Sequence, residues 1–531
     1  MDPLTEHEHP AGRRAVPLAL AAALALYAWL VAHFRFVCDD AYISFRYARH
    51  LAEGAGLRFN PAESPPVEGY SNLLWVLWLA PFERLGVDVR LAAVWTSAVC
   101  GAILIALAVR LARRRLGLYG GPLVASALVL ASLPPFVLWA TGGLETMACT
   151  LALFAAFERL TLDPERPRFV AAGACGAAAV LLRADGALWL AMVGAAALVG
   201  APREHRARTL RAVLATGAIA ALALVGQLAF RLSYHHEWIP NTARVKTGLS
   251  SLRLERGLRY LASLLLELPA LALVPLAASL WRPARTRSAL AAAVVVLCAG
   301  AYAVFVGGDF MAMGRFVVPA MPFVALCFGA LAAALWRVRH GGALLALATA
   351  LVVGSSLLAA FDRAPVSDAL RQRVHFRWNE QRARSEARQW LDMRTRADEW
   401  ARIGRALALH SEPGEAIVLP NLGAISYYTE VHAYDPFGLV CPEVARLDRR
   451  ERRASPGHDK GVPPSYFYAR RPDYLGAWIV PAGAPLGAGL TPGYEGSPLA
   501  QVTRIERYPL PPGDDFRPGE ELRVLRLVLP D

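Results

Sequence analysis

Two adjacent acids, Asp39 and Asp40, are the strongest candidates for chemistry in this sequence. They follow the first apolar block and precede an amphipathic stretch, Ala41 to Glu53. A carboxylate held there could take a proton from a hydroxyl group as a general base. Two other interpretations stay open: a helix N-cap, where aspartate is favoured, and a hard divalent cation held by the paired oxygens.

Four basic residues are candidates for binding a phosphate group. Arg46 lies one turn from Arg49 on the amphipathic stretch, and a guanidinium fork suits phosphate, although contact with lipid headgroups would explain it equally. The other three candidates are Arg183, Lys246 and Arg315. Arg183 could instead pair with Asp185 and close a hairpin, and Lys246 could be a solvated loop charge. Arg315 could pair with Asp309 and close a turn.

Further polar residues are candidates for contacts with the substrate. Several lie beside glycines, which permit tight backbone turns. The predicted substrate-binding set comprises Glu68, Tyr70, Glu145, Asp185, Asn241 and Asp309.

The composition places these residues in a membrane protein. The chain has 531 residues, 55% of them hydrophobic, and a mean hydropathy of +0.35, whereas soluble domains are about 45–50% apolar. The net charge of +13 does not indicate a nucleic-acid partner, because the arginines cluster between apolar blocks.

The apolar blocks predict about eleven transmembrane helices, since about twenty apolar residues cross the hydrocarbon layer. The stretch Asn72 to Leu85 is short and contains Pro81, Glu83 and Arg84, so it is predicted to be an interfacial helix. The predicted spans are 15–37, 91–109, 121–139, 142–160, 168–183, 186–200, 210–230, 259–280, 288–306, 317–336 and 342–361.

Arginine positions predict the orientation of these spans. Arg13 and Arg14 precede the first span, and arginine clusters recur in every second loop, as the positive-inside rule requires. The basic loop from Arg231 to Gly257 departs from the rule. With this threading, the candidate residues all fall on the extracytoplasmic side, which predicts a reaction centre there because ionisable groups near the membrane tend to mark a site.

The chain is predicted to have two parts. Residues 1–361 form the membrane part, with an outer loop and interfacial helices at about 38–90, and residues 362–531 form a soluble α/β domain outside the cytoplasm. Short apolar runs such as Ala416 to Leu419 and Leu522 to Leu529 are its expected strands. Cys38 and Cys441 flank polar regions on that side, where a disulfide is chemically permitted.

Several segments together resemble the GT-C superfamily, most closely the actinobacterial terminal arabinofuranosyltransferases and their broader relatives. The first is the most specific: DDAYISFRYARHLAEGAGLRFNP from Asp39, then VEGYSNLLW from Val67, GGLET from Gly142, RADG from Arg183, PNTARVK from Pro240 and GGDFMAMGRF from Gly307. The resemblance implies a membrane glycosyltransferase with Asp39 as the base and Asp40 in support. The chain lacks an obvious additional C-terminal carbohydrate-binding module.

The resulting expectation is an inverting enzyme of the cytoplasmic membrane. It would move a sugar, arabinofuranose by the resemblance, from a polyprenyl-phosphate donor to a cell-envelope glycan or glycolipid at the outer face. No Gly-rich nucleotide loop is present, and a lipid-linked donor needs none. The alternatives are a flippase of lipid-linked sugars and a non-catalytic membrane scaffold with the same body.

Overall fold

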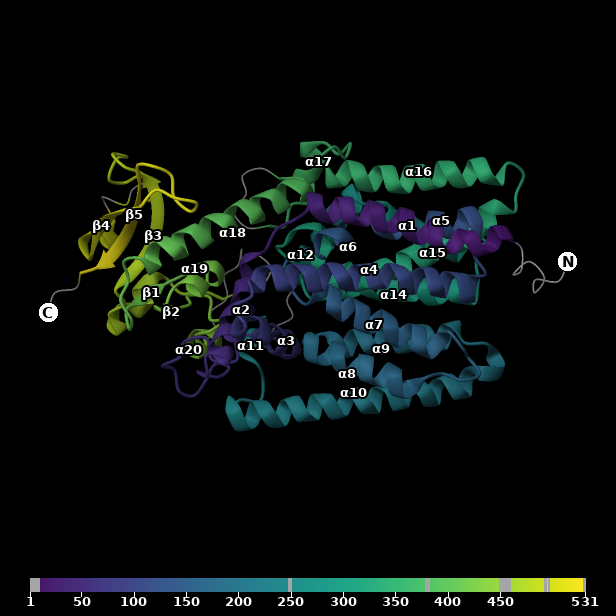
Figure 1. The fold of residues 1–531 in the computed structure, drawn as a ribbon, viewed down its shortest axis with the longest axis horizontal. Coiled ribbons are helices and arrows are strands. Elements are labelled where there is room, and N and C mark those ends of the chain that lie inside the picture. The colour runs from purple at the N-terminus through teal and green to yellow at the C-terminus, as the bar shows by residue number, and fades with distance from the viewer. Residues whose placement is uncertain are drawn as a thin grey trace.

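The computed structural model is elongated, with a helical bundle along most of its length and a small sheet at one end (Figure 1). It describes residues 10–246, 251–377, 383–447, 460–490, 494 and 497–528. The N-terminal end of the first helix lies at the end of the bundle opposite the sheet.

A helix lies in each of the eleven apolar segments. The segment 121–139 holds a second short helix, α6 (Pro134–Leu138), and the segment 259–280 holds parts of two helices that meet at a sharp bend. The bundle helices are α1 (Pro10–His33), α4 (Val89–Leu116), α5 (Gly120–Ser132), α7 (Thr146–Thr161), α8 (Phe169–Leu182), α9 (Gly186–Gly200), α10 (Arg206–Tyr234), α12 (Ser251–Glu267), α13 (Ala270–Leu280), α14 (Arg287–Phe305), α15 (Met321–Trp336) and α16 (Gly341–Ala360).

The number of eleven complete spans is not confirmed. Six helices in the described parts are long and apolar enough to cross a membrane, or seven if the pair α12 and α13, bent by 86°, counts as one span. The apolar helices α5, α8 and α9 have 13, 14 and 15 residues. At 1.5 Å per residue, helices of this length are shorter than the hydrocarbon layer of about 30 Å.

Two helices of the outer loop carry the first candidate residues. α2 (Asp39–Ala52) begins at the paired acids and is buried on all sides from Ala41 to Ala48, and α3 (Leu73–Arg84) occupies the predicted interfacial stretch. Leu77 and Trp78 on α3 are exposed, as expected for a helix lying against lipid.

Two further short helices border the same end of the bundle. α11 (Asn241–Lys246) follows α10, and the 3-10 segment η3 (Ala312–Ala320) precedes α15. Within η3 the backbone leaves the helical conformation at Met313 and Gly314, which have φ of 55° and 62° and form a kink. This kink separates the loop that contains Asp309 from the helix that follows.

The C-terminal part contains a mixed five-stranded sheet of order β2-β1-β3-β5-β4. β1 pairs in parallel with β2 and β3, whereas β5 pairs antiparallel with β3 and β4. Its elements are α17 (Asp368–Arg373), α18 (Glu386–Ala408), β1 (Ala416–Val418), α19 (Gly423–Tyr428), β2 (His432–Tyr434), α20 (Pro442–Arg446), η4 (Pro464–Arg470), β3 (Tyr474–Pro481), α21 (Pro498–Gln501), β4 (Thr503–Pro509) and β5 (Glu520–Leu527).

The sheet shares its core with the bundle. One continuous cluster of buried apolar residues runs from α1 to Ile417 on β1 and Val524 on β5. A separate domain beginning at residue 362 therefore remains a prediction, although the two expected strands are present as β1 and β5. Cys38 and Cys441 are both free thiols.

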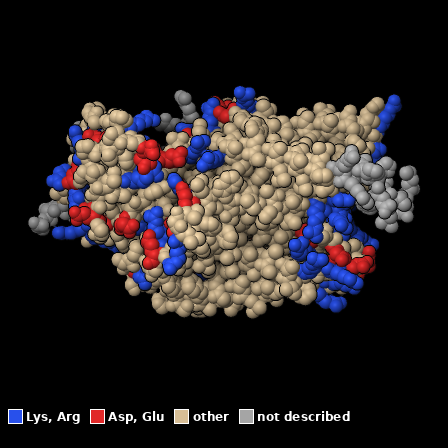
Figure 2. Space-filling view, viewed as in Figure 1, with Lys and Arg blue, Asp and Glu red and all other residues tan. Residues whose placement is uncertain are grey.

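Charged residues gather at the two ends of the molecule, and a broad band without them lies between (Figure 2). Such a band is what a protein that crosses a bilayer presents to lipid. The bundle is therefore that of a multi-pass helical membrane protein. Which end faces the cytoplasm remains a prediction.

That orientation can be tested by labelling. Tyr466, in η4, is 39% exposed near the sheet, and Arg114, at the far end of α4, is also exposed. A membrane-impermeant maleimide is expected to label Tyr466→Cys in intact cells and Arg114→Cys only after permeabilisation, because the sheet end is predicted to lie outside. The unsubstituted chain gives the background of its seven native cysteines. The reverse labelling pattern would contradict the predicted orientation.

Candidate active site

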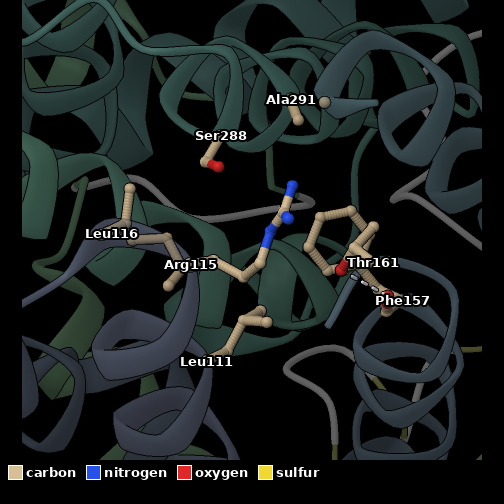
Figure 3. A pocket seen from close by; sticks show the side chains of 9 residues that line it. Leu111, Arg115, Leu116, Phe157, Thr161, Ser288 and Ala291 are labelled. Carbon is tan, nitrogen blue, oxygen red and sulfur yellow. Dashed lines mark hydrogen bonds between the residues drawn. The ribbon is translucent and has the colours of Figure 1, made fainter. Parts of the chain in front are cut away.

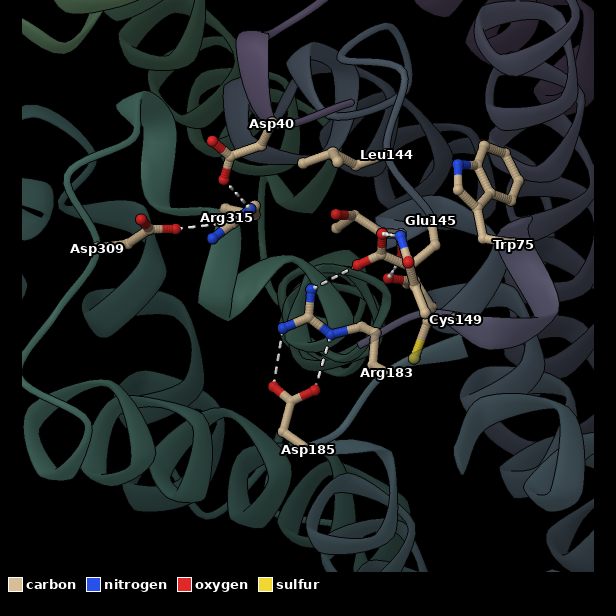
Figure 4. A network of polar contacts seen from close by, with 12 residues as sticks. Asp40, Trp75, Leu144, Glu145, Cys149, Arg183, Asp185, Asp309 and Arg315 are labelled. Atoms are coloured by element: carbon tan, nitrogen blue, oxygen red, sulfur yellow. Dashed lines mark hydrogen bonds and ion pairs between the residues drawn. The ribbon is translucent and has the colours of Figure 1, made fainter. Parts of the chain in front are cut away.

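A polar network lies at the end of the bundle next to the sheet (Figure 4). It consists of two ion-paired groups on either side of the Phe316 ring: one from the segment before α7 and the turn between α8 and α9, and one from α2, η3 and the loop before η3. Six predicted site residues belong to it: Asp40, Glu145, Arg183, Asp185, Asp309 and Arg315.

Arg183 closes the turn between α8 and α9. Its Nε and Nη2 atoms donate to the two oxygens of Asp185, each at 2.8 Å, so the turn-closing ion pair that the sequence left open is present. The third nitrogen, Nη1, reaches Glu145 Oε1 at 3.4 Å. Arg183 therefore links the turn between α8 and α9 to Glu145, in the segment before α7.

Arg315 connects the loop before α15 to α2. Its Nε donates to Asp309 Oδ2 at 2.8 Å, and its Nη1 lies 4.0 Å from Asp40 Oδ2. Its guanidinium lies 5.7 Å from the ring centre of Trp139 and 5.3 Å from that of Phe316, within cation–π range. Arg315 is thus held from several sides, which gives it a defined position beside Asp40.

Gly308 permits this loop to approach α12 closely. Its φ is +77°, and a Cβ atom there would lie 2.7 Å from Cβ of Tyr260. Nearby, Arg253 and Arg256 of α12 donate through Nε to the carbonyl oxygens of Val306 and Gly307, each at 3.0 Å. Two arginines therefore lie against the turn that leads into Asp309.

The network contains more acids than bases. Four carboxylates, those of Asp40, Glu145, Asp185 and Asp309, face two guanidinium groups, those of Arg183 and Arg315. With all groups ionised, the sum is minus two. Arg183 and Arg315 are thus already neutralised by their partners, and an added phosphate needs further positive charge.

Asp39 does not point into the network. Its carboxylate accepts backbone hydrogen bonds from Ala424 at 2.7 Å and Gly423 at 3.1 Å, at the start of α19. A Cβ atom at Gly423 would lie 1.9 Å from the carbonyl oxygen of Asp39, so glycine permits the contact. Asp39 therefore faces α19, whereas the side chain of Asp40 is 41% exposed beside Arg315, so the geometry favours Asp40 over Asp39 as the candidate base.

Burial raises the pKa of Asp39 to about 7. A carboxyl whose pKa is higher in the folded state keeps its proton there after the unfolded chain has lost it, so stability falls between about pH 4 and 7. The melting temperature is expected to fall over this range, and Asp39→Asn is expected to reduce the slope. The slope should not vanish, because burial also raises the pKa of Glu63 to about 7 and that of Asp435 to about 6. An unchanged slope in Asp39→Asn would contradict the prediction.

Arg46 has a structural role, which corrects its assignment to phosphate. The residue is 1% exposed, and its guanidinium donates to the carbonyl oxygens of Phe59 at 2.8 Å and Val431 at 3.0 Å. It also donates to those of Ser426 and Thr429. Because its three nitrogens are occupied by backbone acceptors, Arg46 holds α2 against the C-terminal part and cannot reach a ligand.

Three other predicted residues form a second group, between the outer loop and the end of α10. Glu68 pairs with Arg231, and the Tyr70 hydroxyl lies 3.1 Å from His235 Nε2. Asn241 donates through its backbone N–H to the carbonyl oxygen of Glu68 at 3.1 Å. Within the described parts of the chain, no hydrogen bond or ion pair joins this group to the network.

Lys246 cannot be placed with either group. It ends α11, and its side chain lies outside the described residues. Among the described residues, no cluster of three or more His, Cys, Asp or Glu side chains is placed to hold a metal ion.

Sequence reasoning missed two neutral partners of the network. Tyr302 donates its hydroxyl to Asp185 Oδ2 at 2.7 Å, and Asn72 donates to Glu145 Oε2 at 2.8 Å. The sequence signal for Tyr302 was its position as a tyrosine inside the apolar segment 288–306. Asn72 lies inside the conspicuous segment VEGYSNLLW but carries no charge, so its sequence position alone did not single it out.

Comparison with known proteins gives a partial family match. Residues 379–510 match a family model described as a domain of unknown function, DUF8728. This covers about a quarter of the chain and assigns no activity. No curated protein matches the chain significantly.

Solved structures resemble the whole chain. ArnT from Cupriavidus metallidurans bound to undecaprenyl phosphate aligns with a TM-score of 0.57 and 15% identity, covering 97% of this chain and 99% of that one. The apo structure of the same protein gives a TM-score of 0.56 and 16% identity, with the same coverage.

A more distant structure is the oligosaccharyltransferase AglB from Archaeoglobus fulgidus, with a TM-score of 0.49 and 12% identity over 79% of this chain and 65% of that one. The arabinofuranosyltransferase-like resemblance is not confirmed by these matches. What the ArnT structures show is that this chain shares their fold over almost its whole length.

Proposed function

We propose that this protein is a membrane glycosyltransferase that uses a polyprenyl-phosphate sugar as its donor. The observation that carries the proposal is the network, in which one part-exposed carboxylate, that of Asp40, lies beside Arg315, whose side chain is only 11% exposed. The fold supports the choice of donor, because ArnT of this fold has been crystallised with undecaprenyl phosphate.

In the proposed reaction, Asp40 accepts the proton of an acceptor hydroxyl. The hydroxyl oxygen forms a bond to the anomeric carbon of the donor sugar, and the bond from that carbon to the phosphate oxygen breaks. The leaving group is the polyprenyl phosphate, and displacement from the opposite face inverts the anomeric centre. A base positioned this way typically contributes about 10²–10⁴-fold to the rate.

Positive charge for the departing phosphate comes from several arginines in this proposal. Arg315 and Arg183 are pre-positioned by their carboxylate partners, and fixed charges of this kind stabilise charge that develops in a transition state. Arg253 and Arg256 on α12 place two further guanidinium groups beside the Gly307 turn, which leads into Asp309.

The proposed setting is the outer face of the cytoplasmic membrane, with a cell-envelope glycan or glycolipid as the acceptor. Arabinofuranose is the donor sugar that the sequence resemblance favours. The second group, with Glu68, Tyr70 and Asn241, lines the junction of the outer loop with α10 and α11, and we assign it to support of that junction.

The direct test is transfer of radiolabelled sugar from a panel of polyprenyl-phosphate sugars to envelope glycans by the purified full-length protein. We expect transfer from one donor, with release of one polyprenyl phosphate for each sugar moved. Failure with every donor, in protein shown by its melting curve to be folded, would overturn the proposal. ATP-independent movement of the intact lipid-linked sugar across vesicles would favour a flippase instead.

A further inference from the structure

The two ends of the bundle are held together in different ways. At the end remote from the sheet the helices pack closely, and the cavity beside Arg115 and Phe157 measures about 20 Å³, room for about one water molecule (Figure 3). At the sheet end, the loop between α14 and α15 is held by side chains of the C-terminal part. This loop contains Asp309 and Arg315 of the network.

Two charged side chains of the C-terminal part bind the loop segment 310–313. Arg377, which precedes α18, donates through Nε to the carbonyl oxygen of Phe310 at 3.0 Å. Glu386, the first residue of α18, accepts through Oε2 from the backbone N–H of Met313 at 2.7 Å. The two side chains also pair with each other at 2.8 and 2.9 Å, so each fixes the position of the other.

Two neutral side chains of α18 add further contacts with the same segment. Gln389 donates through Nε2 to the carbonyl oxygen of Phe310 at 3.3 Å, and the Met393 sulfur accepts from the backbone N–H of Ala312 at 3.3 Å. Most of these side chains are buried, so water competes little for their hydrogen bonds. Together the four side chains form a clamp on the loop: Arg377, Glu386, Gln389 and Met393.

The clamp acts on a strained point of the backbone. Met313 has a φ of 55°, in the left-handed region that residues other than glycine rarely adopt. Such a conformation persists only where the surrounding structure enforces it. Because the carboxylate of Glu386 accepts from the N–H of Met313 itself, it stabilises the kink at the residue that is strained.

The kink lies between the two site residues of the loop. Asp309 precedes it and Arg315 follows it, and the two side chains pair at 2.8 Å. Arg315 in turn lies 4.0 Å from Asp40 (Figure 4). The direction in which Arg315 leaves the loop therefore depends on the backbone conformation at Met313.

We propose that Glu386 is a positioning residue for the candidate active site, because it holds the kink at Met313 and thereby places Arg315 beside Asp40. The inference rests on the proposed function, in which Arg315 stabilises the departing phosphate. A misplacement of about 1 Å can cost about 10²-fold in rate. The six residues of the network all precede residue 362, so in this proposal the C-terminal part contributes to transfer through α18.

The test measures the loop and the reaction separately in the full-length protein. Hydrogen–deuterium exchange of peptides covering residues 309–316 reports on the loop whether or not the protein transfers sugar. Glu386→Ala removes both the acceptor of the Met313 N–H and the partner of Arg377. Glu386→Gln keeps one oxygen that can accept from Met313, so it should have a smaller effect.

Arg371→Gln is the matched control. Arg371 donates through Nε to Glu267 at 2.8 Å, and Glu267 accepts from the backbone N–H of Glu386 at 3.0 Å. The substitution therefore leaves a buried carboxylate uncompensated at the same junction. In the described structure, Arg371 has no hydrogen bond or ion pair with the segment 310–313, so its loss should lower stability without releasing the loop.

We expect exchange in the loop to accelerate about tenfold or more in Glu386→Ala, the usual effect of losing a hydrogen bond to a charged group. Transfer should fall about 10²-fold in the same variant. Both should change little in Arg371→Gln at a temperature where the protein stays folded. Adding Glu386→Ala to Arg315→Gln should lower transfer little further, because Glu386 acts through Arg315, whereas independent losses would multiply.

Unchanged exchange in Glu386→Ala would overturn the clamp, and multiplied losses of transfer would overturn positioning through Arg315. Absence of transfer in the unsubstituted protein would instead overturn the proposed function, and the exchange result would still decide for or against the clamp. If Glu386→Ala fails to fold, Met393→Leu removes the sulfur acceptor of Ala312 at similar volume. Unchanged exchange of the loop in that variant would contradict the proposal.

Discussion

Asp40→Asn is expected to reduce sugar transfer by about 10²–10⁴-fold while leaving the melting temperature almost unchanged. The asparagine side chain has nearly the same shape but cannot accept the acceptor's proton. Asp40 is 41% exposed, and its ion-pair contact in the described structure is the 4.0 Å approach of Arg315, so little stability depends on its charge. Transfer rates and melting curves measured on the same preparation check both halves of the prediction.

Asp39→Asn is the matched control, one residue away, and should behave in the opposite way. Its carboxylate accepts from two backbone N–H groups of α19, and an amide NH₂ cannot replace both acceptors. Below about pH 4, where both side chains are neutral, the loss is expected to be about 1–3 kcal/mol in stability and to shrink as the pH rises towards 7, with the folded protein still active. If instead Asp39→Asn folds normally without activity and Asp40→Asn retains activity, the base is Asp39 and the choice of Asp40 is wrong.

Arg315→Gln is expected to lower transfer by about 10²-fold or more, since it removes a fixed positive charge beside the reacting groups. It should also destabilise the protein by about 3–5 kcal/mol, because it leaves Asp309 as an uncompensated buried carboxylate. Asp309 is only 3% exposed. Melting curves and single-turnover transfer rates give the two effects separately.

A double variant distinguishes the two roles of Arg315. Adding Asp309→Asn to Arg315→Gln removes the uncompensated charge, so most of the lost stability should return. Transfer should stay low, because the positive charge beside Asp40 is still missing. Recovery of both stability and transfer in the double variant would show that Arg315 acts only in folding.

The proposed function does not depend on the outcome for Glu386. Glu386 lies outside the network and reaches it only through the backbone of the loop that leads to Arg315. Normal transfer in Glu386→Ala, with transfer lost in Asp40→Asn, would support the active site and contradict the positioning role.

Local pattern was enough to predict the positions of most elements. Each of the eleven apolar segments contains a helix, α2 starts at Asp39, α3 occupies the predicted interfacial stretch, and β1 and β5 lie in the two apolar runs of the C-terminal part. These features depend on composition over a few turns of chain, which the sequence displays directly. Apolar content does not reveal where a helix ends against its neighbours, so the number of complete spans is not confirmed.

The sequence also indicated that unusual polar residues would gather at one end, and six of them form the network. The local pairs Arg183–Asp185 and Arg315–Asp309 were among the sequence alternatives, whereas the partners from distant segments were decided only by the tertiary structure. Asp39 and Asp40 are neighbours in the chain, yet successive residues of a helix point about 100° apart, so one meets α19 and the other faces Arg315. Arg46 and Arg315 are both arginines, yet Arg46 donates to backbone carbonyl oxygens and Arg315 to the carboxylate of Asp309. Residue type supplies the chemistry, and only the packing of distant segments decides whether a side chain meets a backbone carbonyl, a carboxylate or open space.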